Sequence, residues 1–247
     1  MIIKKSNRLV LGNWKMHGSI LENTILLSKL RNVDHSLHCD FGILAPFPYL
    51  SQVLTILHGT KICWGAQNIS MYNFGAYTGE VSAAMLKEFG CSLVLVGHSE
   101  RRILYKETNL DIAGKASAAL SLDITPVVCF GETLDEYNSK KTFSVIESQV
   151  SSILELGGKS VSRMIFSYEP VWAIGSGSAA SPEYAQDIHA FIRGMLHQVG
   201  ADSIRILYGG SVKASNAASF FVMPDIDGAL VGNASLVTDD FLGITKL

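Results

Sequence analysis

The chain has 247 residues, of which 48% are hydrophobic and 17% are charged, and its formal net charge is −2. The 20 basic and 22 acidic residues nearly balance, and no run of Lys and Arg is longer than a pair, which excludes the usual electrostatic footprint of a nucleic-acid-binding protein. No apolar run exceeds four residues, far short of the roughly 20 that a membrane-spanning helix needs, and the N-terminus does not resemble a signal peptide.

Eight short aliphatic runs recur along the chain at intervals of about 31 residues. Most are apolar at consecutive positions, which is typical of strands that are buried on both faces. We expect strands at residues 8–12, 41–45, 61–65, 93–97, 125–130, 164–168, 204–208 and 228–231.

Segments with helical spacing lie between these runs. In the first, a spacing of three to four residues joins Ile20, Asn23-Thr24, Leu27 and Leu30. Near residues 80–89, an acidic Glu80 at the start and Gly90 after the end suit the helix dipole and the preference for glycine after a helix. We expect helices at 19–33, 48–58, 80–89, 110–122, 143–156, 182–199, 214–221 and, briefly, 239–242.

Alternation of strands and helices predicts parallel strands joined by right-handed crossovers. Eight such units in about 250 residues match a closed, eight-stranded parallel (β/α)8 barrel. We therefore expect residues 1–247 to form a single barrel catalytic domain of the α/β class. The alternative, an open doubly wound sheet, would need a glycine-rich phosphate-binding turn after the first strand, and the stretch from Gly12 to Lys15 is not one.

Three of the predicted strands end in residues that can carry chemistry. The first strand leads to Lys15, the fourth to His98 and the sixth to Glu169. Each has an ordinary explanation on its own: a solvated lysine, a structural histidine, or a glutamate paired with Arg101 or Arg102. Because catalytic groups of such barrels lie at the carboxyl ends of the strands, their coincidence at one rim favours a shared site.

The turns after the last two strands are rich in glycine. Gly209, Gly210 and Ser211 follow the seventh strand, and Gly232 and Asn233 follow the eighth. Such turns let backbone N–H groups face a phosphate, although an ordinary tight turn would look the same. No group of residues has the spacing of metal ligands, so we expect no metal.

The segment 170–182 carries no charge and directly follows Glu169. Small residues behind a rigid Pro170 and Trp172 predict a lid that closes over the site, with a merely exposed loop as the alternative. The four cysteines lie far apart in apolar surroundings, so we expect reduced, buried thiols and a cytoplasmic protein. They are Cys39, Cys63, Cys91 and Cys129.

Taken together, six motifs in this order resemble the triosephosphate isomerase family over nearly the whole chain. They are Asn13-Trp14-Lys15-Met16, Gly65-Ala66-Gln67-Asn68, Gly97-His98-Ser99-Glu100-Arg101-Arg102, Tyr168-Glu169-Pro170-Val171-Trp172, Tyr208-Gly209-Gly210-Ser211-Val212 and Asp227-Gly228-Ala229-Leu230-Val231-Gly232. The resemblance implies a TIM barrel that interconverts dihydroxyacetone phosphate and D-glyceraldehyde 3-phosphate, in glycolysis and gluconeogenesis, without cofactor or metal.

The resemblance also implies a role for each residue at the rim. Glu169 would be the base, and His98 would be a neutral electrophile; this pairing comes from the family and not from the residues alone. Lys15 and Asn13 would stabilise developing negative charge, and Glu100 would pair with the lysine. A helix beginning just beyond His98 would disfavour the charged form of its ring.

By the same resemblance, the substrate phosphate would be held by backbone groups of Gly175, Ser211, Gly232 and Asn233 under a lid at 170–180. Glu132 and Tyr168 would lie against Trp172 when the lid is open. The loop 67–80, with Thr78 near its tip, would reach into a second subunit, and the expected partner is therefore a second copy of the chain.

Two positions depart from the family pattern. The rear of the lid has only small residues at 178–180, which is expected to loosen its closure. The usual Gly-Gly pair is Gly232-Asn233, which is expected to preserve phosphate binding because asparagine tolerates positive φ and keeps its N–H.

Two alternatives to this function remain at the level of sequence. One is a phosphate-binding barrel aldolase that uses Lys15 to form a Schiff base. The other is a binding protein that has the barrel but no catalytic activity.

Overall fold

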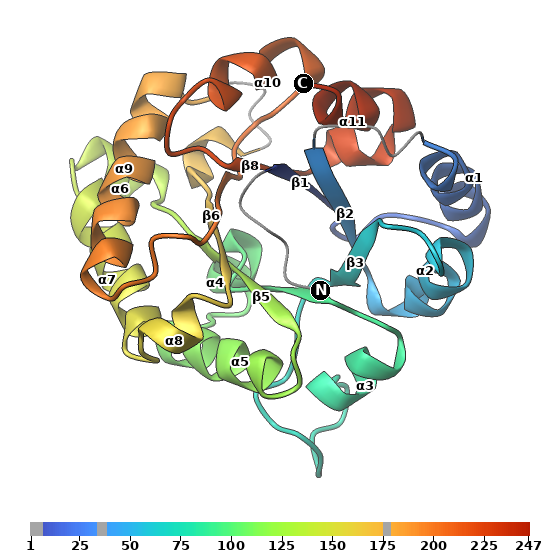
Figure 1. Cartoon of the computed structure of the whole chain (residues 1–247). Helices are drawn as coiled ribbons and strands as arrows, with labels where there is room; N and C mark the ends of the chain where they lie inside the picture. The colour runs from blue at the N-terminus through green and yellow to red at the C-terminus, as the bar shows by residue number, and fades with distance from the viewer. Residues whose placement is uncertain (1–6, 34–38, 175–178) are drawn as a thin grey trace.

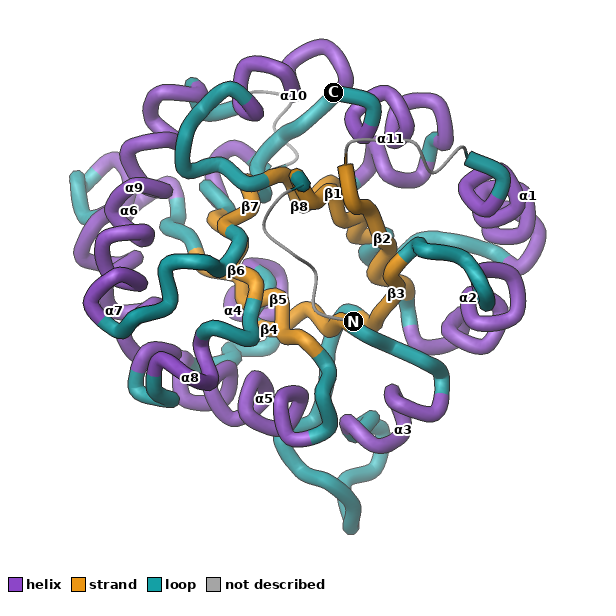
Figure 2. Tube along the Cα trace, in the orientation of Figure 1, coloured by secondary structure: helices purple, strands orange, loops and turns teal. Residues whose placement is uncertain are grey.

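The computed structural model describes residues 7–33, 39–174 and 179–247, and these contain a closed barrel of eight parallel strands. The barrel closes because β1 pairs with both β2 and β8, which Figure 2 shows as a complete ring of strands. The strands are β1 (Arg8–Asn13), β2 (Cys39–Ala45), β3 (Cys63–Ala66), β4 (Leu93–Val96), β5 (Thr125–Phe130), β6 (Ile165–Tyr168), β7 (Ile206–Tyr208) and β8 (Gly228–Val231). This architecture confirms the predicted (β/α)8 barrel.

Helices form an outer ring around the strands (Figure 1). They are α1 (Ile20–Arg31), α2 (Leu50–Leu57), α3 (Ala83–Glu88), α4 (Ser99–Leu104), α5 (Asn109–Ser121), α6 (Leu134–Asn138), α7 (Thr142–Leu154), α8 (Gly158–Val161), α9 (Pro182–Gln198), α10 (Ala214–Phe221) and α11 (Thr238–Thr245). Short 3₁₀ turns lie at η1 (Phe47–Tyr49), η2 (Val171–Ala173) and η3 (Asn233–Leu236). No described helix is both long enough and apolar enough to cross a bilayer.

All eight predicted strands are present, with ends that differ by at most two residues from the prediction. The interior of the barrel and the layer between strands and helices form two separate apolar clusters. On β1, for example, Leu9 and Leu11 point into the barrel while Val10 packs toward the helices. Burial on both faces explains why the strands read as continuous apolar runs. Rigid strands of this kind hold their carboxyl ends in a fixed ring.

Two details of the predicted helices were wrong. Helix α3 begins after Ser82, whose Oγ accepts the N–H of Met85, so Glu80 lies in a preceding turn and not at the helix start. On the expected spacing of α1, Leu27 and Leu30 are buried, but Ile20 at the start of the helix is 73% exposed. Asn23, on the same spacing, is buried, and its Nδ2 donates to Oε1 of Gln52 on α2.

Other expectations were confirmed in part. Gly90 has a φ of +68°, as a residue after a helix end requires. All four cysteines are free thiols, but Cys63 is only partly buried, contrary to the prediction. The helix expected just beyond His98 is present as α4, whereas α6 and α8 were not predicted because four or five residues are too few to show a helical period.

Helix α9 packs a histidine behind the strand that carries the site. His189 is fully buried, its Nδ1 lies 3.2 Å from the carbonyl oxygen of Asp225, and its ring meets Tyr168 edge-on. Burial lowers the pKa of His189 from 6.5 to about 4, against the opposing effect of the Asp225 carbonyl. The imidazole is therefore neutral in the folded chain at pH 5, while the unfolded chain binds a proton.

This histidine makes the fold sensitive to acid. Above pH 6.5 it is neutral in both states, and between pH 6.5 and 4 the unfolded state gains the proton, so the free energy of unfolding falls by about 3 kcal/mol. Urea unfolding at pH 7.5 and 4.5 measures the loss. The variant His189→Asn should lose about 3 kcal/mol less between the two pH values than the unaltered chain. The control His58→Asn, at an exposed position, should lose as much unfolding free energy between the two pH values as the unaltered chain does. Equal losses in the unaltered chain and both variants would contradict the assignment to His189.

Candidate active site

The carboxyl ends of five strands surround a cavity of about 220 Å³. The cavity brings together seven of the nine predicted site residues: Asn13, Lys15, His98, Glu169, Ser211, Gly232 and Asn233. Glu100 lies next to it through its contact with Lys15, whereas Gly175 falls outside the described residues. Residues from β1, β4, β6, β7 and β8 thus meet at one rim, as the spacing of the motifs predicted.

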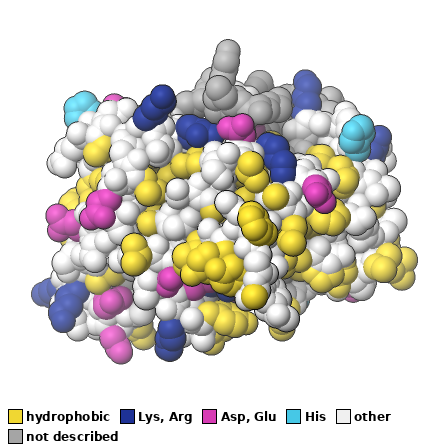
Figure 3. Space-filling view, turned by 90° about the horizontal axis from the view of Figure 1, so that it is seen from below, with side chains coloured by type: hydrophobic (Ala, Val, Ile, Leu, Met, Phe, Trp, Pro, Cys, Tyr) yellow, Lys and Arg dark blue, Asp and Glu magenta, His cyan; other side chains and the backbone are white. Residues whose placement is uncertain are grey.

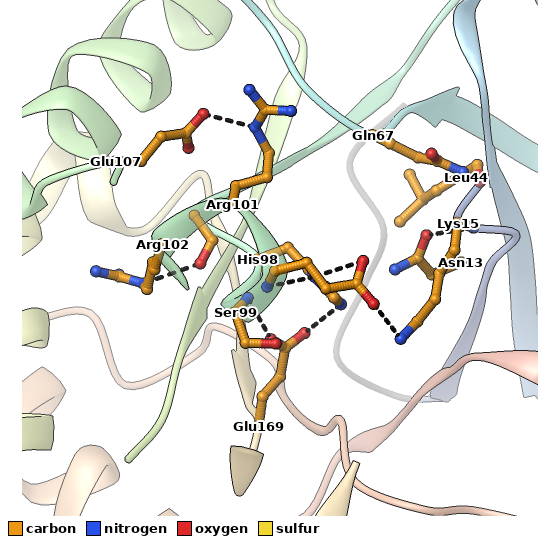
Figure 4. Close-up of polar contacts among 12 residues, drawn as sticks. Asn13, Lys15, Leu44, Gln67, His98, Ser99, Arg101, Arg102, Glu107 and Glu169 are labelled. Atoms are coloured by element: carbon orange, nitrogen blue, oxygen red, sulfur yellow. Dashed lines mark hydrogen bonds and ion pairs between the residues drawn. The ribbon is translucent and has the colours of Figure 1, made fainter. Parts of the chain in front are cut away.

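Lys15 enters the cavity from an unusual backbone conformation. Its φ is +52°, in the left-handed region that a residue with a β-carbon rarely adopts. The N–H of Lys15 donates to Oδ1 of the buried Asn13 at 3.0 Å, which holds this turn in place (Figure 4). Strain of this kind persists only where surrounding contacts enforce it, and it is common at functional sites.

The ammonium group of Lys15 is paired with a carboxylate. Its Nζ lies 2.6 Å from Oε1 of Glu100, a residue of α4. Partial burial alone would raise the pKa of Glu100, but the hydrogen bond from Lys15 and nearby positive charge bring that pKa below its ordinary value. Glu100 is therefore ionised near neutral pH, and its contact fixes the lysine beside the cavity.

His98 sits immediately before α4 and acts as the cap of that helix. Its Nδ1 accepts the backbone N–H of Glu100 at 3.2 Å, and its Nε2 lies 3.5 Å from Oε1 of Glu169 (Figure 4). An N–H that donates to Nδ1 favours a neutral ring with its proton on Nε2. That proton faces the cavity, where it can be donated to a substrate oxygen.

Glu169 is almost completely buried at the end of β6. Its Oε2 accepts the backbone N–H of Ser99 at 3.1 Å, while Oε1 has no hydrogen-bond donor among the described residues. A β-carbon at Gly209 would lie 2.7 Å from Cγ of Glu169, so only glycine leaves room for this side chain. The carboxylate is therefore packed tightly on one side and free to accept a proton on the other.

The two arginines after His98 do not pair with Glu169. Arg101 pairs with Glu107 through its Nε, and Arg102 donates to the carbonyl oxygens of Gly97 and Cys129. Arg102 thus ties the ends of β4 and β5 together beneath the site. The ordinary explanation for Glu169, a structural ion pair with either arginine, is excluded by these contacts.

An aromatic cluster lies beside the start of the predicted lid. Oε1 of the buried Glu132 accepts hydrogen bonds from Trp172 at 2.8 Å and from Tyr168 and Tyr184 at 3.1 Å. The ring of Tyr137 stacks on Trp172. Burial raises the pKa of Glu132, although the three donors act in the opposite direction. The contacts of Glu132 and Tyr168 with Trp172 match the prediction, but those of Tyr184 and Tyr137 were not predicted.

The far end of the predicted lid segment is bonded to β7. The backbone N–H of the buried Ala180 donates to the hydroxyl of Tyr208 at 3.2 Å. Ser178, the first of the three small residues expected at this hinge, lies outside the described residues. Ala180, the last residue of the predicted hinge, thus has a specific anchor that the sequence did not indicate.

The two glycine-rich turns line the cavity opposite His98. A β-carbon at Gly210 would lie 2.2 Å from the hydroxyl of Tyr208, so the turn before Ser211 requires glycine. A β-carbon at Gly232 would lie 3.6 Å from Cε of Lys15, which places the lysine side chain along the second turn. In the described part of the chain, no group of three or more His, Cys, Asp or Glu side chains could hold a metal ion.

Comparison with known proteins decides the family. The family model for triosephosphate isomerase matches residues 8–247. The chain belongs to the triosephosphate isomerase family. Among its relatives, the triosephosphate isomerase of Bordetella pertussis is 56% identical over 237 residues, which is 96% of each chain. The triosephosphate isomerase of Thiobacillus denitrificans is 49% identical over 243 residues, 97% of each chain, and that of Nitrosomonas europaea is 49% identical over 240 residues, 95% of each chain.

The residues that match the triosephosphate isomerase family model include all six motifs from which the resemblance was recognised. The motifs are spread over the chain but meet at the carboxyl ends of the strands. Among the residues that sequence reasoning missed is Ser99, which holds Glu169 through its backbone. A backbone contact of this kind leaves no signal in residue type.

Proposed function

We propose that the chain interconverts dihydroxyacetone phosphate and D-glyceraldehyde 3-phosphate, an aldose–ketose isomerisation of glycolysis and gluconeogenesis, and that residues 1–247 act as a single catalytic barrel. The observation that carries the proposal is the triangle of Glu169, His98 and Lys15 around one cavity. His98 lies 3.5 Å from the Glu169 carboxylate, and Lys15 is fixed by Glu100 at 2.6 Å. This arrangement offers a base, a neutral hydrogen-bond donor and a cation to one small substrate.

Side chains of the described site can carry out each proton transfer of the proposed reaction. The carboxylate of Glu169 takes a proton from C1 of the ketone and, as a carboxylic acid, returns it to C2. Oε2 of Glu169 accepts the N–H of Ser99 in the present arrangement, and we propose that the carboxylate leaves this N–H when substrate binds. His98 donates from Nε2 to the developing oxyanions of the enediolate and moves protons between the two oxygens. Lys15, with the Asn13 side chain, stabilises the same negative charge.

The phosphate site consists of the two glycine-rich turns. Ser211, Gly232 and Asn233 line the cavity together with Lys15, which supports a role in holding the phosphate group. Gly175 is proposed from the family pattern alone. Closure of the segment 170–180 would exclude water and keep the enediolate from losing its phosphate.

A coupled assay tests this function. The purified chain is supplied with D-glyceraldehyde 3-phosphate, and dihydroxyacetone phosphate is detected by its reduction with NADH and glycerol-3-phosphate dehydrogenase. We expect turnover without added metal, and in the presence of a chelator. A rate no higher than that of the buffer would contradict the proposal.

The aldolase alternative is disfavoured by the state of Lys15. A Schiff base forms from a neutral amine, usually in a desolvated pocket, whereas Lys15 is an ion pair with Glu100. Treatment with borohydride and dihydroxyacetone phosphate should leave the mass of the chain unchanged. A reduced adduct on Lys15 would support the aldolase instead.

Asn233 is the departure from the family pattern that touches the phosphate site. It is the first residue of η3 and is exposed at the cavity. Because its backbone N–H is independent of the side chain, Asn233→Gly should change KM for D-glyceraldehyde 3-phosphate by less than about tenfold, or ~1.4 kcal/mol. Steady-state kinetics measures the change. A larger gain in affinity would show that the asparagine side chain obstructs the phosphate.

We also propose that the chain forms a homodimer through loop 67–80. The loop projects beyond the ring of helices (Figure 1), and Phe74 near its tip is 89% exposed. Tyr72 and Tyr77 stack on each other at 4.1 Å within the loop. Hydrophobic side chains also gather on the face that Figure 3 shows. A loop of this composition is stabilised when a partner covers it.

The cavity that would receive the partner's loop lies beside the active site. It has a volume of about 570 Å³ and is lined by apolar residues such as Met16, Phe47 and Leu104 as well as by Lys15 and His98. Loop 67–80 of a second copy would fill it and shield the catalytic lysine from water. Dimerisation and activity should therefore be linked.

Replacing Phe74 by a charge tests the dimer. Phe74→Glu should convert the chain from dimer to monomer in sedimentation equilibrium at micromolar concentration, and should lower kcat/KM, because an unpaired carboxylate would be buried in the interface. Val222→Glu is the control, since Val222 is 74% exposed just after α10. An unaltered chain that sediments as a monomer would contradict the proposed dimer.

The four free thiols are consistent with a cytoplasmic location, which we propose as well.

A further inference from the structure

The charges already described leave the cavity with an excess of negative charge. Lys15 contributes one positive charge, and Glu100 and Glu169 contribute one negative charge each, while His98 is neutral. Lys15 and Glu169 line the cavity and Glu100 lies beside it, so these groups sum to −1. Under the proposed function the cavity must admit a phosphate ester carrying about two negative charges. A site with this balance alone would repel its substrate at a distance.

Lys213 lines the same cavity from the turn between β7 and α10. Its side chain is exposed, and among the described residues no carboxylate oxygen lies within 4.0 Å of its ammonium group. It is therefore an unpaired cation at the cavity, unlike Lys15, which is neutralised in part by Glu100.

The backbone that carries Lys213 is held in place by Asn216. The N–H of Lys213 donates to Oδ1 of Asn216 at 2.8 Å, and Nδ2 of Asn216 donates to the carbonyl oxygen of Ser211 at 3.1 Å. One side chain thus fixes Lys213 relative to Ser211, the residue proposed for the phosphate. Lys213 also immediately precedes α10, whose amino end carries partial positive charge.

We propose that Lys213 is a second cationic residue for the substrate phosphate, one that attracts the dianion into the cavity and holds it there by its charge. The proposal rests on the proposed function. With Lys213 included, the ionised groups at the cavity sum to zero instead of −1. Because the group acts through water over several ångströms, its effect must depend on salt, with a screening length of about 10 Å at 0.1 M ionic strength. It acts on binding and association and leaves the proton transfers to Glu169 and His98.

The direct test is the affinity for inorganic phosphate, measured by isothermal titration calorimetry without any turnover. At 10 mM ionic strength, Lys213→Gln should weaken phosphate binding by roughly three- to tenfold, and at 0.5 M by less than about twofold. Lys213→Arg, which keeps the charge, should stay within about twofold of the unaltered chain at both. The control is Lys159→Gln, an exposed lysine of α8, which precedes β6 and so lies at the opposite end of the barrel.

Kinetics separate this role from a structural one. The loss in Lys213→Gln should fall on KM and kcat/KM for D-glyceraldehyde 3-phosphate and shrink with added salt, whereas the slow turnover of unphosphorylated D-glyceraldehyde should not change. A loss that is equal for both substrates, or equal for Lys213→Gln and Lys159→Gln, would overturn the proposal. If the unaltered chain does not isomerise, the proposed function fails, and the phosphate titration still decides whether Lys213 binds the anion.

Discussion

Shortening the proposed base by one methylene group should nearly abolish turnover. In Glu169→Asp we expect kcat to fall by about 10²- to 10³-fold with KM changed by less than about threefold, because a displacement of about 1 Å at the reacting atoms costs on the order of 10²-fold. A shift of the backbone cannot restore the lost reach, since Gly209 packs against Cγ of Glu169 and the backbone of Gly131 lies against its carbonyl oxygen. Steady-state kinetics in both directions measures the effect.

The control for this variant is Glu147→Asp, the same change at an exposed position of α7. It should leave kcat within a factor of two. If Glu169→Asp retained the kcat of the unaltered chain, Glu169 would not be the base, whatever the family. A loss confined to KM would also contradict the assignment, because it would mean that the carboxylate only binds substrate.

Removing the cation beside Glu100 should have an effect of similar size. In Lys15→Met we expect kcat/KM to fall by about 10³-fold or more, since one preorganised group that stabilises an oxyanion is worth about 10²–10³-fold and the phosphate loses a charge as well. The variant also leaves the Glu100 carboxylate, whose side chain is 46% exposed, facing the cavity without its partner at 2.6 Å. Both changes disfavour an anionic substrate.

A double variant separates these two causes. If the unpaired carboxylate were the main problem, Lys15→Met combined with Glu100→Gln would regain most of the activity. We expect it to regain about tenfold at most, because the missing cation, and not the remaining anion, limits the reaction. Lys159→Met, at the other end of the barrel, should behave as the unaltered chain. Activity within tenfold of the unaltered chain in Lys15→Met would show that the lysine is not part of the chemistry.

The sequence predicted the barrel because each strand is apolar on both faces and is followed by a helical pattern. Strands β5 and β8 were predicted at both ends, whereas β7 begins two residues later than expected. Where a strand begins depends on its pairing with neighbouring strands, which the local pattern does not contain. On α1 the spacing grouped Ile20 with Asn23, yet Ile20 at the first position of the helix is exposed, while the polar Asn23 is buried against Gln52 of another helix.

The sequence predicted those site residues that directly follow a strand, because the ends of the strands could themselves be predicted. Lys15, His98 and Glu169 follow three strands, so the fold brings them together without any further information. The contacts that orient them come from elsewhere. Ser99 holds Glu169 across 70 positions of sequence through a backbone group, and Lys15 reaches the cavity through a left-handed turn that no residue type requires. Tyr184 reaches Glu132 from 52 positions away.

The central claim is that Glu169, His98 and Lys15 act together on a triose phosphate in this cavity. A crystal structure with a planar hydroxamate phosphate, which imitates the enediolate, tests it most directly. We predict that Glu169 leaves the N–H of Ser99 and lies within about 3.2 Å of the atom that replaces the reacting carbon, with Nε2 of His98 and Nζ of Lys15 on the ligand oxygens. The phosphate should lie against Ser211, Gly232 and Asn233. A ligand bound elsewhere, or bound in the cavity with Glu169 still held by Ser99, would contradict the account.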